Sequence, residues 1–120
     1  MKISFDFDST LSEPHIQEIA KAMIAADHEV YIMTSRMTPP NESLFIQVNM
    51  DIFSTAIKLN IPNSNIIFTK GTLKTEFIKS LSMDIHFDDM WDEIDEINKC
   101  TKCKGIFVGF MSEIIKCIKV

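Results

Sequence analysis

A regular alternation between two kinds of segment limits what this chain can fold into more than any other feature. Short runs rich in aliphatic and aromatic residues predict strands, and each run is followed by a segment with apolar residues at helical spacing. The predicted strands are residues 2–7, 29–33, 65–69, 83–87 and 105–110, and the predicted helices are residues 14–27, 45–59, 72–80, 90–99 and 112–118. This pattern predicts an α/β, Rossmann-like three-layer sandwich with a five-stranded parallel sheet, for which we take the strand order 3-2-1-4-5.

Length and composition favour a single domain that covers residues 1–120. With 46% hydrophobic residues, the chain can bury a core without disulfides or structural metals. Its beginning, MKISFDFDST, lacks the apolar core of a secretory signal, and no stretch is long enough to span a bilayer. We therefore expect a cytoplasmic protein that has no contact with membranes.

The cysteines and the net charge exclude other classes of protein. Cys100, Cys103 and Cys117 are an odd number of cysteines, which favours reduced thiols. Cys100 and Cys103 form a CxxC pair without a second pair or paired histidines, so we do not expect a zinc site. The net charge of −5 argues against a broad nucleic-acid surface, although a few local cations can still hold a small anion.

Acidic residues close two of the predicted strands, which is unusual in a buried sheet. Asp6 and Asp8 end the first strand, and Asp88 and Asp89 follow the fourth. In the order 3-2-1-4-5 these strands are neighbours where the strand order reverses, and ligands bind outside the carboxyl ends of strands at that point. We expect both acidic pairs to meet in one pocket, with Thr34 at the end of the second strand.

Carboxylates that meet in this way repel one another, and a hard divalent cation with oxygen ligands relieves the repulsion. Mg²⁺ is the natural candidate, because it takes one or two carboxylates and completes its shell with water and phosphate oxygens. The Thr34 hydroxyl would donate to a phosphate oxygen, and Lys74 would balance the charge of phosphate and acids. These residue types predict a phosphoryl-transfer site.

Four segments resemble, in the same order, the motifs of the haloacid dehalogenase-like (HAD) hydrolase superfamily. DFDST is similar to the signature DxDxT, YIMTSR places Thr34 at the second motif, Lys74 stands at the third, and HFDD supplies the acidic fourth. The resemblance extends over nearly the whole chain. Lys70 competes with Lys74 for the third motif, and Lys74 is favoured because it opens a helix, whereas Lys70 beside Gly71 suits a loop.

The resemblance implies a phosphatase that works through an aspartate. Asp6 would be the nucleophile and form an aspartyl-phosphate, and Asp8 would protonate the leaving oxygen and then activate water. Mg²⁺ would be held by the Asp6 side chain, the Asp8 main-chain carbonyl and a fourth-motif acid, with Asp88 as the first choice and Asp89 as the alternative. An aspartate at position 8 also resembles phosphatases rather than dehalogenases.

Substrate contacts are expected from residues that follow the second and third strands. Ser35, Arg36 and Lys70 are the candidates, although Ser35 could instead cap the following segment and Arg36 could be a loop charge. No inserted cap domain fits between the motifs, so the site resembles those of capless HAD phosphatases. We expect a phosphorylated substrate, with nucleotides or phosphate-ended nucleic acid first and a phosphoprotein next.

Two other functions compete with this interpretation. A catalytically silent HAD-like scaffold is the main alternative, but residues able to do the chemistry fill all four motifs. A phosphoacceptor receiver domain needs an acid after the third strand, which instead ends in Phe68-Thr69-Lys70. His86 is interpreted as a core histidine within the fourth strand. Asp92 and Glu93 could orient the metal shell from the first turn of the helix over residues 90–99, but acids there also complement the helix dipole, which is the favoured interpretation.

Overall fold

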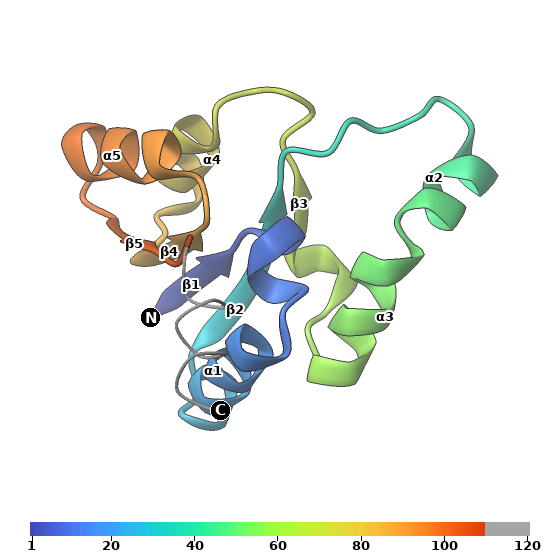
Figure 1. Cartoon of the computed structure of the whole chain (residues 1–120), viewed down its shortest axis with the longest axis horizontal. Helices are drawn as coiled ribbons and strands as arrows, with labels where there is room; N and C mark the ends of the chain where they lie inside the picture. Colours follow the sequence, from blue (N-terminus) through green and yellow to red (C-terminus); the bar gives the residue numbers. More distant parts are fainter. Residues whose placement is uncertain (110–120) are drawn as a thin grey trace.

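The computed structural model describes residues 1–109, which form one parallel sheet with helices on both faces (Figure 1). The strands are β1 (Lys2–Phe5), β2 (Glu29–Thr34), β3 (Ile66–Phe68), β4 (Ile85–Asp88) and β5 (Lys104–Phe107). Their order is β3-β2-β1-β4-β5, and every neighbouring pair is parallel. The predicted α/β fold class and strand order are therefore confirmed.

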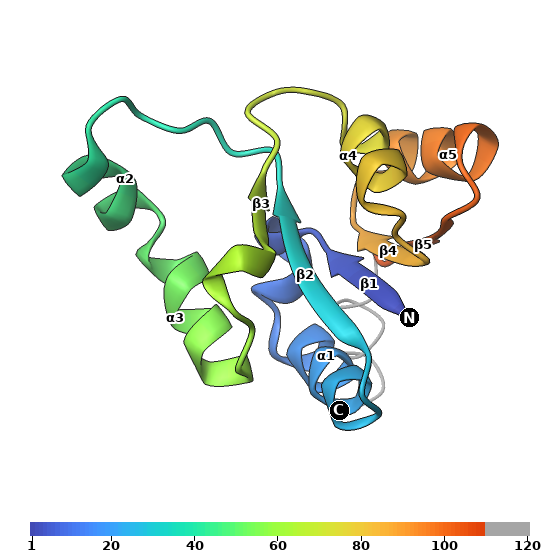
Figure 2. The same ribbon diagram turned by 180° about the vertical axis from the view of Figure 1, so that it is seen from behind.

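The helices form two layers, one on each face of the sheet. Figures 1 and 2 show α1 and α3 on one side and α4 and α5 on the other. The bounds are η1 (Phe7–Leu11), α1 (Pro14–Ala25), α2 (Glu42–Val48), α3 (Met50–Leu59), η2 (Asn63–Asn65), α4 (Lys74–Leu81) and α5 (Trp91–Cys100), where η1 and η2 are short helical turns. Among the described residues, no helix is long and apolar enough to cross a membrane.

Two separate cores hold the layers together, because side chains alternate between the faces of a strand. Ile3 and Phe5 of β1 belong to the core beneath α1 and α3, whereas Met33 of β2 belongs to the core beneath α4 and α5. The first core also contains Ile16, Ala20, Val30, Ile32, Ile52, Ala56 and Phe87, and the second also contains Ile78, Met83, Ile97 and Cys103. Apolar burial on both faces is typical of a parallel sheet.

The first strand is shorter than predicted, because the chain leaves the sheet after Phe5. Residues 6 and 7 were predicted to continue the strand, but Phe7 begins the irregular turn η1. Within that turn Ser9 has a φ of +57°, a left-handed conformation that redirects the chain toward α1. The predicted end of this strand is therefore wrong. Asp6 directly follows β1, and Asp8 lies within η1.

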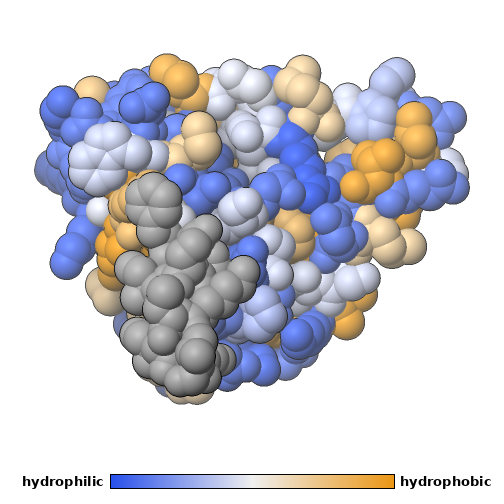
Figure 3. All heavy atoms as spheres, in the orientation of Figure 1, coloured by the Kyte–Doolittle hydropathy of each residue, from blue (hydrophilic) through white to orange (hydrophobic). Residues whose placement is uncertain are grey.

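The prediction of one helix over residues 45–59 is also wrong, because the structure contains α2 and α3 with a break at Asn49. The buried Asn49 side chain donates from Nδ2 to the Phe45 carbonyl at 2.9 Å, and a side-chain bond of this kind competes with helical hydrogen bonding. In Figure 1, α2 stands away from the sheet. Its apolar residues Leu44, Ile46 and Val48 are exposed, and orange surface gathers at this helix in Figure 3.

The segments between the motifs contain no additional domain. Only η1 and α1 lie between β1 and β2, and only α2, α3 and η2 lie between β2 and β3. The carboxyl edge of the sheet is thus bordered by loops and helix ends of the same domain. The helix predicted at residues 112–118, Cys117 and the predicted strand end at Phe110 lie outside the described residues.

Candidate active site

Asp6 is the first residue beyond β1, and it lies beside β4 at the carboxyl edge of the sheet. Its backbone N–H donates to the Phe87 carbonyl at 2.9 Å, and its carbonyl accepts from the Leu11 N–H at 3.0 Å. These bonds fix the backbone between the strand and η1, while the side chain is only 6% exposed. The adjacency of β1 and β4 therefore brings Asp6 to the acids at the end of β4.

Lys74 is the cation at the centre of the site. It begins α4 and is 2% exposed, and its Nζ donates to Asp6 Oδ1 at 2.8 Å and to Asp88 Oδ2 at 2.7 Å. A carboxylate oxygen of Glu93, in the first turn of α5, lies 3.3 Å from the same nitrogen. One buried ammonium thus joins side chains from the ends of β1 and β4 and from α5.

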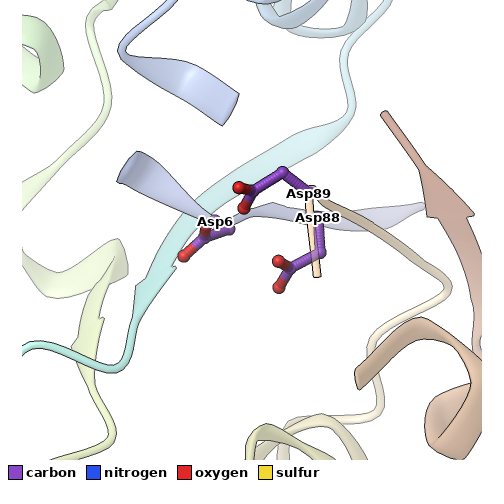
Figure 4. A group of neighbouring side chains, drawn as sticks. All are labelled: Asp6, Asp88 and Asp89. Carbon is purple, nitrogen blue, oxygen red and sulfur yellow. The ribbon is translucent and has the colours of Figure 1, made fainter. Parts of the chain in front are cut away.

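Asp6, Asp88 and Asp89 form a cluster of carboxylates, with their oxygens turned toward a common space (Figure 4). Each offers an oxygen within 4.8 Å of the others. Asp88 is fully buried, whereas Asp89 is half-buried and accepts a long hydrogen bond of 3.5 Å from the Thr10 hydroxyl. The structure therefore brings together three of the four acids that were expected to meet.

Both oxygens of Asp88 already have hydrogen-bond donors. Oδ2 accepts from Lys74 and lies 2.8 Å from His86 Nε2, and Oδ1 accepts from the Met90 N–H at 3.0 Å. Asp89 keeps more of its carboxylate available for a cation. This geometry favours Asp89 over Asp88 as a direct metal ligand, which reverses the order of preference expected from the sequence.

Burial and neighbouring charges perturb the acids differently. Burial raises the pKa of Asp6 to about 8; the Lys74 charge opposes this rise and the Asp88 charge adds to it. Burial also favours a higher pKa for Asp88, but the hydrogen bond from His86 and the Lys74 charge outweigh this effect and hold the pKa below its usual range. Burial lowers the pKa of His86 and raises that of Glu93. Asp6 is therefore the acid whose ionised form is most disfavoured.

The Lys74 ammonium remains charged in this environment. Burial alone would lower its pKa, but the charges of Asp6 and Asp88 and their hydrogen bonds raise it above the usual value. The site consequently holds a permanent cation next to an excess of carboxylates.

Arg36 is a second cation near the site, and its guanidinium is already paired. It donates to both carboxylate oxygens of Asp8, at 3.0 and 2.6 Å, and to both oxygens of Asp51, at 2.9 and 2.8 Å. Its guanidinium carbon also lies 5.3 Å from the centre of the Phe7 ring. These bonds lower the pKa of Asp51 and raise that of Arg36. Arg36 therefore links α3 to η1 through its bonds to Asp51 and Asp8.

A cavity of about 310 Å³ opens among these groups. It is lined by Asp6, Asp8, Ser9, Ser35, Lys74, Asp89, Met90 and Glu93. Thr34 is buried and is not part of this lining; its hydroxyl accepts from the Arg36 N–H at 3.2 Å. Lys70 is exposed and also lies outside the lining. Of the two candidate lysines, the structure brings Lys74 to the acids.

For Glu93 and His86 the sequence favoured a structural interpretation, and Asp51 received no role. For Glu93 the helix-dipole interpretation was favoured over a place in the metal shell. Its position in the first turn after HFDD was nevertheless a usable signal, because side chains there point back toward the strand end. His86 is the buried histidine that was predicted, and it also contacts Asp88. Asp51 gave no sequence signal, since its contact with Arg36 depends on where α3 begins.

Comparison with known proteins adds no relative to this description. The chain matches none of the protein-family models against which it was compared, and a search of curated proteins gave no significant match. The functional argument therefore depends on the geometry of the site and on the resemblance of its motifs.

The raised pKa of Asp6 predicts that Asp6→Asn stabilises the metal-free protein at pH 8. The folded state binds the Asp6 proton up to about pH 8, whereas an unfolded aspartate loses it near its ordinary pKa of 3.8. The stability of the wild-type protein therefore falls as the pH rises between these values, and the Asp6→Asn variant does not show this loss of stability. Thermal unfolding with a chelator should show no gain near pH 4 and the largest gain at pH 8.

The control is Asp92→Asn, which changes the same charge at an exposed position on α5. Loss of the favourable charge at the start of α5 should lower its stability only slightly, and Asp92→Asn should show no gain in stability that grows toward pH 8. An Asp6→Asn variant that is less stable than the wild type at pH 8 would show that the attraction of Lys74 exceeds the effect of burial.

Proposed function

We propose that this chain is a Mg²⁺-dependent phosphomonoesterase of the capless HAD-like type, with Asp6 as its nucleophile. The observation that carries the proposal is the Lys74 ammonium, which bonds one Asp6 oxygen and Asp88 at the carboxyl edge of β1 and β4. The resemblance predicted this combination of a first-strand aspartate, a lysine and fourth-strand acids. The cavity beside them is lined by both Asp6 and Asp89.

The residues present fit a divalent cation. The oxygens of Asp6, Asp88 and Asp89 gather within 4.8 Å, and hard cations prefer such oxygen ligands. Both oxygens of Asp88 accept from Lys74, His86 or Met90, whereas Lys74 engages only Oδ1 of Asp6. We therefore assign Asp6 and Asp89 as the side chains that would hold the ion, and Asp6 would do so through the oxygen that does not attack phosphorus. Bound Mg²⁺ would offset the charge of a phosphate beside these acids.

The hydrolysis follows from the positions of the two first-motif aspartates. Lys74 engages Asp6 Oδ1, so Oδ2 is the oxygen proposed to attack phosphorus and form an aspartyl-phosphate. As the ester P–O bond breaks, Asp8 gives its proton to the leaving oxygen. Asp8 then takes a proton from water, which attacks the same phosphorus and releases inorganic phosphate and free Asp6.

Arg36 has to change its contacts during this cycle. It engages both oxygens of Asp8, so neither is available to carry the leaving-group proton while that contact lasts. Asp51 offers the guanidinium a second carboxylate, and a substrate phosphate would offer a third partner. We infer that Arg36 releases Asp8 and donates to the substrate phosphate when substrate binds, while it keeps its bonds to Asp51.

The proposed substrates are nucleotides or phosphate-ended nucleic acid. A cavity of about 310 Å³ is at the small end of ligand pockets, roughly 300–1,000 Å³, so it suits a terminal phosphate and the atoms next to it. Lys74 and Arg36 supply cations for such an end group, while the net charge of −5 disfavours contact along a long nucleic-acid backbone. A phosphoprotein is the next choice.

The reaction predicts that Asp6→Asn abolishes turnover without loss of the fold. A screen of nucleotides, phosphate-ended oligonucleotides, phosphopeptides and p-nitrophenyl phosphate should identify a substrate of the wild-type protein in the presence of Mg²⁺. With that substrate, an amide nucleophile should lower kcat by more than about a thousandfold. Phosphate release and circular dichroism would be measured together, with Asp92→Asn as the active control.

Wild-type turnover by purified Asp6→Asn would contradict the covalent mechanism. Absence of phosphate release from every ester in the presence of Mg²⁺ would instead favour the scaffold interpretation of the same fold.

The metal assignment predicts different outcomes for Asp89→Asn and Asp88→Asn. Loss of the Asp89 carboxylate should weaken Mg²⁺ affinity at least about tenfold in titration calorimetry, with little effect on metal-free stability. Loss of the Asp88 carboxylate should lower the metal-free melting temperature, because Lys74 and His86 then lose a charged acceptor inside the protein. Wild-type Mg²⁺ affinity in Asp89→Asn would contradict the assignment.

A further inference from the structure

A continuous chain of buried hydrogen bonds runs from β1 through β4 to the proposed nucleophile. Ser4 Oγ lies 2.7 Å from His86 Nδ1, and His86 Nε2 lies 2.8 Å from Asp88 Oδ2. Asp88 Oδ2 accepts from Lys74, which also donates to Asp6. Ser4, His86 and Asp88 are 0% exposed, so water does not compete for these contacts. The part of this chain that lies behind Asp88 has no role in the proposed reaction.

The direction of the hydrogen bond between His86 and Asp88 follows from the acceptor. Oδ2 of Asp88 is a carboxylate oxygen that already accepts from Lys74, so His86 Nε2 has to carry the hydrogen and donate it. This donation holds whether or not Nδ1 is protonated. The Ser4 hydroxyl can rotate either to donate to Nδ1 or to accept from it, so it holds the ring in either state.

The sheet provides room for an imidazole at this position. His86 is in register with Ser4 on β1 and with Gly105 on β5, which are small residues. A Cβ atom at Gly105 would come within 3.3 Å of the Ile94 backbone oxygen in α5, so a larger residue there would press against that helix. The neighbours of His86 thus leave it space and give it a polar partner on one side.

We propose that His86 is a positioning residue for the nucleophile and acts through Asp88 and Lys74; this inference rests on the proposed function. A carboxyl group turns easily about its last torsion angle; the Met90 N–H holds Oδ1 of Asp88, and His86 holds Oδ2, the oxygen that accepts from Lys74. The oriented Asp88 holds Lys74 at 2.7 Å, and Lys74 in turn holds one Asp6 oxygen. Glu93 already lies 3.3 Å from Lys74, so without His86 the ammonium can shift toward Glu93 and away from Asp6.

Two amide substitutions distinguish the roles of the two ring nitrogens of His86. In His86→Gln the amide nitrogen can occupy the place of Nε2 and donate to Asp88, whereas in His86→Asn the shorter amide reaches only the place of Nδ1, beside Ser4. Groups that orient a catalytic ligand typically contribute on the order of 10–100-fold, so we expect His86→Asn to lower kcat by about that factor. KM should change less than about threefold, and His86→Gln should recover most of the lost kcat.

A merely structural role for His86 predicts a different pattern. Both variants remove ring volume from the core, so a packing effect would lower kcat and the melting temperature in both. Equal kcat in the two variants, at the wild-type or at a reduced level, would overturn the proposal. If His86→Asn does not fold, Ser4→Ala removes only the hydroxyl behind the ring, and it should lower kcat a few fold at unchanged KM; unchanged kcat in that variant would overturn the proposal.

Crystal structures of the variants distinguish failure of this inference from failure of the proposed function. If the wild-type protein hydrolyses none of the phosphate esters, the proposed function is wrong, and the position of Lys74 still decides the inference. Lys74 should bond both Asp6 and Asp88 in His86→Gln and should leave Asp6 in His86→Asn. Retention of both bonds in His86→Asn would overturn the positioning role.

Discussion

The site depends on one buried ammonium surrounded by carboxylates from separate elements. Lys74 is 2% exposed and bonds Asp6 and Asp88, with Glu93 close by. A buried lysine without partners would lose its charge, and buried acids without a cation would do the same. The charge of Lys74 and the charges of the acids therefore stabilise one another. The parallel sheet makes this possible because the ends of β1 and β4 meet at one edge, where α4 begins.

The same charge distribution leaves the site with more carboxylates than cations. Lys74 offsets part of the negative charge, and burial still raises the pKa of Asp6 to about 8. An arrangement of this kind is unfavourable for the stability of the folded protein, which is common where groups are held ready to bind a ligand. A divalent cation and a phosphate would add balancing charges, and the resulting binding energy would stabilise the folded state.

Much of this architecture was predictable from local patterns in the sequence. Alternating apolar runs and helical spacing predicted a parallel sheet with helices on both faces, because strands buried on both faces are apolar along their whole length. The strand order had to be assumed, and the structure has the assumed order. Acids at the ends of two neighbouring strands predicted that Asp6 and Asp88 lie close together. Lys74 was favoured over Lys70 because it opens a helix, and the structure places Lys74 among the acids.

The remaining features depend on side-chain contacts that a local pattern does not contain. The break between α2 and α3 comes from Asn49 bonding a backbone carbonyl, which helical periodicity does not reveal. Arg36 bonds both Asp8 and Asp51, and the second contact depends on where α3 begins. The choice between Asp88 and Asp89 was open in the sequence, since two adjacent acids look alike until His86 and Met90 engage one of them.

The most direct test of the central claim is a crystal structure of the protein with Mg²⁺ and beryllium trifluoride, which imitates a phosphoryl group on a carboxylate without requiring the natural substrate. The account predicts beryllium bonded to the Asp6 oxygen that does not accept from Lys74, next to an ion held by Asp6 and Asp89. The same adduct should form in Asp92→Asn and be absent from Asp6→Asn. An adduct on another aspartate, or none at all in the wild-type protein, would contradict the assignment of Asp6 as the nucleophile.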